Sequence, residues 1–250
     1  MSNRRSFLKQ SAIGAAALPT LSFTNAKYTQ ETADVPEKLT VLFQGDSITD
    51  ARRDRKAYYA NQAHGFGNGY ALYAAIQLSG QHPTTDWTFY NRGISGHKVP
   101  QLDARWREDV LQLQPDVLSI LIGVNDYWHT LNWDYKGTAN SYRDDYRKLL
   151  ERTKKALPNV KLLIAEPFYL AEGTAIDAPK WKSDFPAYQE VAKGIAKEFD
   201  AVFIPFQSVF DEALKTAPTS YWAADGVHPS FAGSYLMATA WLEGFDKLYR

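Results

Sequence analysis

The chain alternates between short apolar runs and longer segments in which apolar positions recur every three or four residues. Five short runs, rich in β-branched and aromatic residues, begin near residues 39, 86, 116, 160 and 201. Their length and near-continuous apolarity are typical of strands that are buried on both faces, as in parallel sheets. The pattern therefore predicts five buried strands.

The segments between these runs have helical periodicity. Between residues 141 and 157 the large apolar side chains fall on one stripe, and Ser141 and Asp144 are spaced as a capping box. A second stripe covers residues 186 to 199, and a last helix is predicted from about Pro229 to the C-terminus. Strands that alternate with helices predict a doubly wound α/β sheet.

The N-terminus resembles a twin-arginine export signal. Arg4 and Arg5 precede a weakly apolar, alanine-rich run, which is shorter than the roughly 20 residues that a membrane span needs. We predict the signal at residues 1–26, a polar linker at 27–38 and a single domain at 39–250. The mature protein is then expected in the periplasm or outside the cell, without a stable membrane anchor. A basic tail without an export function is the alternative.

Composition excludes several classes of function. The 28 basic and 28 acidic residues give a formal net charge of +0, so no global field attracts nucleic acid, and we expect no nucleic-acid partner. Cysteine is absent, which excludes disulfides, thiolate metal sites and a cysteine nucleophile. The oligomeric state stays open.

Small and polar residues follow three of the predicted strands. Ser47 follows the first strand, Gly93 the second and Asn125 the third. Asp225 and His228 lie in the segment "DGVHP", just ahead of the last predicted helix. Ligands of such sheets bind beyond the carboxyl ends of the strands, so these residues are the candidate site.

Their chemical types fit acyl transfer. A serine hydroxyl becomes a nucleophile when a histidine accepts its proton, and an acid on the other ring nitrogen fixes the tautomer. We assign these roles to Ser47, His228 and Asp225. The oxyanion would be bound by the N–H groups of Ser47 and Gly93 and by the side-chain amide of Asn125.

Each residue also has an ordinary structural interpretation. Ser47 alone fits a helix N-cap better than a nucleophile, and Asp46 fits a local turn or cap group. Gly93 and Asn125 fit turns, and His228 fits an exposed loop. Only the combination of all these residues favours catalysis.

The motifs, taken in order, resemble a known family. The blocks "GDSIT", Gly93, "GVND" and "DGVHP" are similar to the four blocks of the SGNH (GDSL-type) serine esterases and acylhydrolases. The resemblance extends from about Leu39 to the C-terminus, with Ile48 where the family's name has leucine. It implies a flavodoxin-like three-layer α/β/α sandwich with a five-stranded parallel sheet, and it implies the catalytic and oxyanion roles assigned above.

Aromatic residues close to the strand ends indicate a class of substrate. Tyr127, Trp128 and Trp222 lie near the candidate site in sequence, and aromatic rings stack on sugar faces, although core packing explains such residues equally well. With export, this favours an esterase that removes O-acetyl groups from a polysaccharide, as some members of the family do. Lysophospholipase, arylesterase and thioesterase activities remain alternatives, and so does a carbohydrate-binding protein without catalysis.

Other motifs carry less weight. "GFGNGY" has Tyr70 where a dinucleotide-binding loop needs its third glycine, and "GISGH" has His97 where a nucleophile elbow needs glycine. The five histidines show no metal-binding spacing. We expect neither a metal nor a cofactor.

Overall fold

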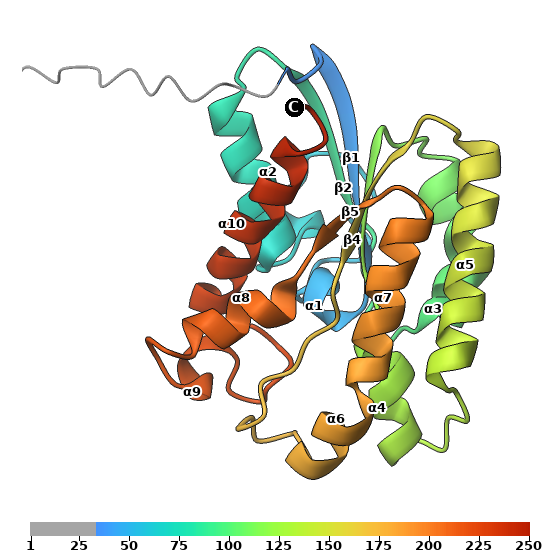
Figure 1. The fold of residues 1–250 in the computed structure, drawn as a ribbon. Helices are drawn as coiled ribbons and strands as arrows, with labels where there is room; N and C mark the ends of the chain where they lie inside the picture. Colours follow the sequence, from blue (N-terminus) through green and yellow to red (C-terminus); the bar gives the residue numbers. More distant parts are fainter. Residues whose placement is uncertain (1–33) are drawn as a thin grey trace, which may run out of the picture. The chain divides into compact units, whose positions relative to one another are not determined.

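The computed structural model describes residues 34–250, and its centre is a five-stranded parallel sheet (Figure 1). The strand order is β2-β1-β3-β4-β5, which is the flavodoxin-like order. The strands are β1 (Lys38–Gly45), β2 (Asp86–Asn91), β3 (Val117–Leu121), β4 (Lys161–Ala165) and β5 (Val202–Ile204). The predicted fold class is confirmed.

Helices cover both faces of the sheet (Figure 1). One layer contains α2 (Tyr70–Gln81), α8 (Phe206–Ala213) and α10 (Phe231–Asp246). The opposite layer contains α3 (Val99–Trp106), α5 (Ala139–Ala156) and α7 (Pro186–Glu198). The remaining elements are α1 (Ser47–Asp50), η1 (Ala63–Gly65), η2 (Arg107–Leu111), α4 (Val124–Asn132), α6 (Ala178–Asp184) and α9 (Thr219–Trp222).

The core lies between the sheet and these two layers. Every residue of β3 is buried, as expected for a central parallel strand. Two core tryptophans have partners for their indole N–H groups: Trp241 donates to Ser119 Oγ at 2.8 Å, and Trp106 donates to Thr153 Oγ1 at 2.8 Å. These bonds avoid the cost of burying an unpaired donor.

Two predicted helix starts differ from the structure. α5 begins at Ala139 with Thr138 as its N-cap, and Thr138 and Ser141 form the capping box. The predicted box of Ser141 and Asp144 is therefore wrong, because the helix begins earlier than its apolar stripe. α10 begins at Phe231, and the Ser230 hydroxyl accepts the N–H of Gly233 as its cap.

The predicted export signal, residues 1–26, lies outside the described residues. Within residues 34–250, none of the helices combines the length and apolarity needed to cross a membrane. The last residues of the predicted linker touch the domain, since the N–H of Asp34 donates to the carbonyl of Tyr249 at 3.2 Å.

Candidate active site

Ser47 is the first residue of α1, immediately beyond the carboxyl end of β1. The N-cap of this short helix is Asp46, whose Oδ1 accepts the N–H of Ile48 at 3.0 Å. The interpretation of Asp46 as a cap group is confirmed, and the alternative that Ser47 caps the helix is wrong. Capping by its neighbour leaves the Ser47 hydroxyl available for another partner.

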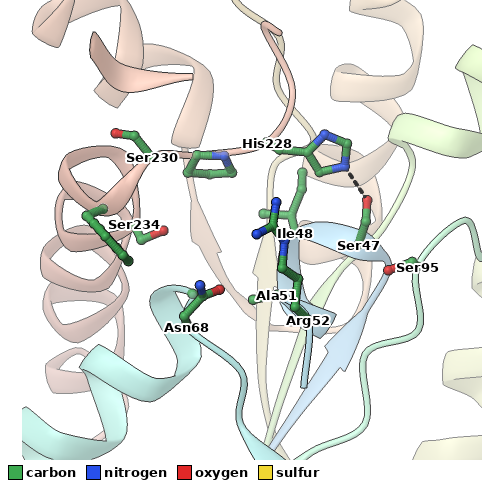
Figure 2. Close-up of a pocket in the computed structure, with 12 residues that line it drawn as sticks. Ser47, Ile48, Ala51, Arg52, Asn68, Ser95, His228, Ser230 and Ser234 are labelled. Atoms are coloured by element: carbon green, nitrogen blue, oxygen red, sulfur yellow. Dashed lines mark hydrogen bonds between the residues drawn. The ribbon is translucent and has the colours of Figure 1, made fainter. Parts of the chain in front are cut away.

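That partner is His228, 181 residues further along the chain. Ser47 Oγ lies 2.8 Å from His228 Nε2 (dashed line in Figure 2), and His228 Nδ1 lies 2.6 Å from Asp225 Oδ2. Because a carboxylate only accepts, the ring proton is on Nδ1 and the Ser47 hydroxyl donates to Nε2. The structure thus brings the three predicted residues into one hydrogen-bonded chain.

The turn that contains Asp225 and His228 is fixed by its backbone. Asp225 Oδ1 accepts the N–H groups of Val227 at 2.9 Å and His228 at 2.8 Å. Gly226 has a φ of +88°, a conformation that glycine adopts without steric cost. This turn holds Asp225 against His228, whose Nε2 contacts Ser47.

The charges in this chain stabilise one another. Burial opposes ionisation of Asp225, but hydrogen bonds from His228 and Val227 lower its pKa to about 2. The hydrogen bond to Asp225 raises the pKa of His228 above 6.5, against the effect of burial. Asp225 is therefore a carboxylate at neutral pH, and it favours the imidazolium that forms when His228 takes a proton.

The three predicted oxyanion donors differ in whether they already have a hydrogen-bond partner. An amide at the first position of a helix has no intrahelical partner, so the Ser47 N–H is available. Asn125, in α4, donates one side-chain N–H to the carbonyl of His97 at 3.3 Å and keeps a second. The Gly93 N–H donates to Asn91 Oδ1 at 2.9 Å, so it can reach an oxyanion only by sharing or exchanging this partner.

Gly93 is needed for close packing. A Cβ at this position would lie 2.4 Å from the backbone nitrogen of Asp50 and 2.8 Å from the carbonyl carbon of Thr49. Both atoms belong to α1, the helix that begins at Ser47. The absence of a side chain at Gly93 lets the loop after β2 lie against the helix of the candidate nucleophile.

Ser47 and His228 line a cavity of about 520 Å³ (Figure 2). The sequence predicted no substrate-binding role for the other residues that line it: Ile48, Ala51, Arg52, Asn68, Gly69, Ser95, Pro229, Ser230, Phe231 and Ser234. Phe231 is 70% exposed, which leaves its ring accessible at this cavity. Most of these residues lie close in sequence to "GDSIT" or "DGVHP", and this proximity is the signal that could have identified them.

The three aromatic residues predicted to contact substrate are not among those that line this cavity. Tyr127 is 3% exposed and packs against Trp181, so it belongs to the core. Trp222 donates its indole N–H to two backbone carbonyls, those of Ala213 and Ala217, and does not line the cavity. The assignment of Tyr127 is therefore wrong, whereas that of Trp222 stays a prediction. Trp128 is half-buried with its ring centroid 6.4 Å from that of His228, and it stays a candidate.

His97, the other histidine near the site in sequence, has a different environment. Its Nδ1 accepts a hydrogen bond from Arg105 Nε at 3.2 Å, and burial lowers its pKa to about 4. Within residues 34–250, no group of three or more histidine, aspartate or glutamate residues is arranged to hold a metal ion. Of these two histidines, His228 contacts Ser47, whereas His97 bonds to Arg105.

Comparison with known proteins agrees with this geometry. The pattern of the GDSL-like Lipase/Acylhydrolase family matches residues 43–236. The chain is 39% identical over 217 residues to an acetylxylan esterase of Geobacillus stearothermophilus, covering 84% of this chain and 95% of the relative.

Solved structures give the same result. A GDSL-like lipase of Parabacteroides merdae superposes with a TM-score of 0.83 at 49% identity, over 85% of this chain and 98% of that one. The acetylxylan esterase of Geobacillus stearothermophilus superposes with a TM-score of 0.73 at 35% identity, over 82% and 93%. The resemblance drawn from the motifs is confirmed: the chain belongs to the GDSL-like lipase/acylhydrolase family, whose members hydrolyse carboxylic esters.

Proposed function

We propose that the protein is a serine esterase that removes O-acetyl groups from a polysaccharide through an acyl-enzyme on Ser47. The observation that carries this proposal is the continuous hydrogen-bonded chain from Ser47 Oγ through His228 to Asp225, with contacts of 2.8 and 2.6 Å. A nucleophile, a base and an orienting acid in this arrangement are the requirements for acyl transfer.

In the first half of the reaction, Ser47 Oγ attacks the ester carbonyl carbon while its proton moves to His228 Nε2. The negative oxygen of the tetrahedral intermediate is bound by the Ser47 N–H and the Asn125 amide, and by the Gly93 N–H when it shares or exchanges its bond to Asn91 Oδ1. When the intermediate collapses, the C–O bond to the sugar breaks and His228 returns the proton to the leaving alkoxide. The acetyl group remains on Ser47 Oγ as an ester.

In the second half, a water molecule attacks this ester. His228 Nε2 takes a proton from the water, a second tetrahedral intermediate forms and the same donors bind its oxyanion. Collapse breaks the bond to Ser47 Oγ, which recovers its proton from His228. Acetic acid leaves, and the starting hydrogen-bonded chain is restored.

The relatives support acetyl esters of a carbohydrate as substrates. The acetylxylan esterase of Geobacillus stearothermophilus covers most of this chain. The cavity around Ser47 is lined by hydroxyl and amide groups, among them Asn68, Ser230 and Ser234, which are suited to hydrogen-bonding sugars. Lysophospholipase, arylesterase and thioesterase activity use the same triad and are the alternatives. A binding protein without catalysis would not require the intact triad.

Acetate release from acetylated xylo-oligosaccharides, beside fatty-acid release from lysophospholipid, tests this function. We expect release of acetate to be faster, and Ser47→Ala to abolish it together with hydrolysis of p-nitrophenyl acetate. Ser79→Ala is the matched control, because its hydroxyl bonds to the Ala75 carbonyl within α2. Equal turnover by Ser47→Ala and wild type would refute the serine mechanism, and faster fatty-acid release would refute the carbohydrate substrate.

Export is the second part of the proposal, and it rests on Arg4 and Arg5 with the apolar run behind them. A twin-arginine signal would deliver the folded enzyme to the periplasm or the outside of the cell, where polysaccharides are encountered. Replacing both arginines by lysine should leave a tagged precursor in the cytoplasm. Export of that variant at the normal rate would contradict this route.

A further inference from the structure

The cavity of the candidate active site contains an arginine that the mechanism above does not use. Apart from His228, Arg52 is the one side chain with a titratable group among the described residues that line it. In Figure 2 the Arg52 side chain extends between Ser47 on one side and Ser234 on the other. The exposed cation of Arg52 therefore lines the same cavity as the candidate nucleophile.

The backbone conformation directs Arg52 into this cavity. Ala51 and Arg52 have φ values of +45° and +63°, a left-handed conformation that costs energy in residues other than glycine. The next residue, Arg53, is 6% exposed and donates its Nε–H to the Gly93 carbonyl at 2.8 Å. Two consecutive arginines thus take opposite directions, with Arg53 in the protein and Arg52 in the cavity.

The guanidinium of Arg52 has no partner in the part of the chain that the structure describes. Within residues 34–250, no hydrogen bond or ion pair engages it, whereas Arg53 bonds to Gly93 and Arg55 forms an ion pair with Asp50. A guanidinium presents its N–H groups as a planar fork that matches a carboxylate in a bidentate geometry. An unused fork in a substrate cavity is suited to an anionic group on the substrate.

A second cavity places Arg52 along the path of a longer substrate. This cavity has a volume of about 380 Å³ and shares Ala51, Arg52 and Asn68 with the cavity of Ser47. An oligosaccharide that occupies both cavities passes the guanidinium. The second cavity also contains the carboxylate of Asp54, which repels an anion, so a negative group on the ligand is favoured on the Ser47 side of Arg52.

We propose that Arg52 binds the carboxylate of a uronic acid close to the acetylated sugar, which makes acetylated acidic oligosaccharides the preferred substrates. This inference rests on the proposed acetylesterase function. It adds a specificity-determining residue to the cavity, because neutral acetylated sugars offer the guanidinium no charge to pair with.

The test compares acetate release from acetylated xylo-oligosaccharides with and without a glucuronic acid branch, and from acetylated oligogalacturonide. The third substrate distinguishes a uronic acid in the main chain from one in a branch. For the wild type, we expect kcat/KM to be about tenfold higher on at least one acidic substrate than on the neutral one, mainly through a lower KM. For Arg52→Gln we expect this ratio to fall to about one. Arg107→Gln, an exposed arginine that does not line the cavity, should keep the wild-type ratio.

The ratio of kcat/KM on an acidic substrate to kcat/KM on the neutral one cancels any general effect of Arg52 on Ser47 or His228. Equal kcat/KM of the wild type on all three substrates would overturn the assignment of Arg52 and leave the acetylesterase function intact. The same holds if Arg52→Gln keeps the preference. Absence of acetate release from every oligosaccharide would instead refute the acetylesterase proposal itself, and the assignment with it.

Discussion

Replacement of Asp225 by asparagine tests the role of this residue in fixing the histidine tautomer. Asp225 Oδ1 accepts two backbone N–H groups, from Val227 and His228, while Oδ2 accepts the proton on His228 Nδ1. An asparagine has one acceptor oxygen, and the two backbone donors should hold it in the position of Oδ1. Its NH₂ group then faces Nδ1, which must accept. The ring proton moves to Nε2, and His228 can no longer take the proton of Ser47.

The magnitude follows from this wrong tautomer. In a serine protease the equivalent change lowers kcat by about 10⁴, which corresponds to roughly 5.4 kcal/mol of transition-state stabilisation at about 1.36 kcal/mol for each factor of ten. We expect a loss of the same order in Asp225→Asn, with little change in KM because the carboxylate does not line the cavity. His228→Ala removes the base altogether and should lose more, about 10⁶, nearly as much as Ser47→Ala.

The assay is hydrolysis of p-nitrophenyl acetate, with nitrogen-15 NMR of the imidazole to identify the protonated ring nitrogen. Asp225→Ala separates loss of the carboxylate from the wrong tautomer, because it places no donor against Nδ1 and should retain more activity than Asp225→Asn. Circular dichroism and thermal unfolding confirm that the variants fold. An Asp225→Asn enzyme within tenfold of the wild-type kcat would refute the reasoning.

Three further predictions follow from the site. Activity should decrease on acidification with a midpoint above pH 6.5, because Asp225 raises the pKa of His228 and only the neutral imidazole accepts a proton, and Asp225→Ala should move the midpoint of kcat/KM to lower pH. Gly93→Ala should cost about 1–3 kcal/mol in thermal unfolding and also lower kcat, since its Cβ collides with the backbone of α1; an unchanged Tm would contradict this packing. Burial raises the pKa of Asp46 to about 7, so the wild type should lose stability as pH rises from 4 to 8. Asp46→Asn lacks this carboxyl group, and its unfolding free energy relative to wild type should therefore rise by a few kcal/mol between these pH values. Denaturant unfolding at pH 4 and pH 8 measures this difference, and an equal difference at both would contradict the prediction.

The sequence predicted most of the fold because buried parallel strands have a strong signature. The five predicted strand starts agree with the structure to within one residue. Parallel pairing then brings the carboxyl ends of the strands to one edge of the sheet. This topology is the reason that a serine and a histidine 181 residues apart in sequence could be assigned to one site before their contact was seen.

The lining of the cavity could not be predicted in the same way. Tyr127 and Trp128 are neighbours on α4, and successive helical residues point about 100° apart, so only one of the two rings can face a given side. Sequence alone does not say which, and Tyr127 is the buried one. Arg52 was missed for a related reason: left-handed backbone is signalled by glycine or asparagine, and here alanine and arginine adopt it.

At the start of α1, the adjacent residues Asp46 and Ser47 have different roles: one caps the helix and the other contacts His228. Both side chains could cap this helix, but only one is needed, and Asp46 takes that role. The Ser47 hydroxyl is then free for His228, and its N–H remains free for an oxyanion. The cap has an electrostatic consequence as well: burial raises the pKa of Asp46, while attraction between Asp46 and His228 lowers the pKa of the acid and raises that of the histidine. A proton that moves from Ser47 to His228 is therefore attracted by two acids, one of which also caps the helix.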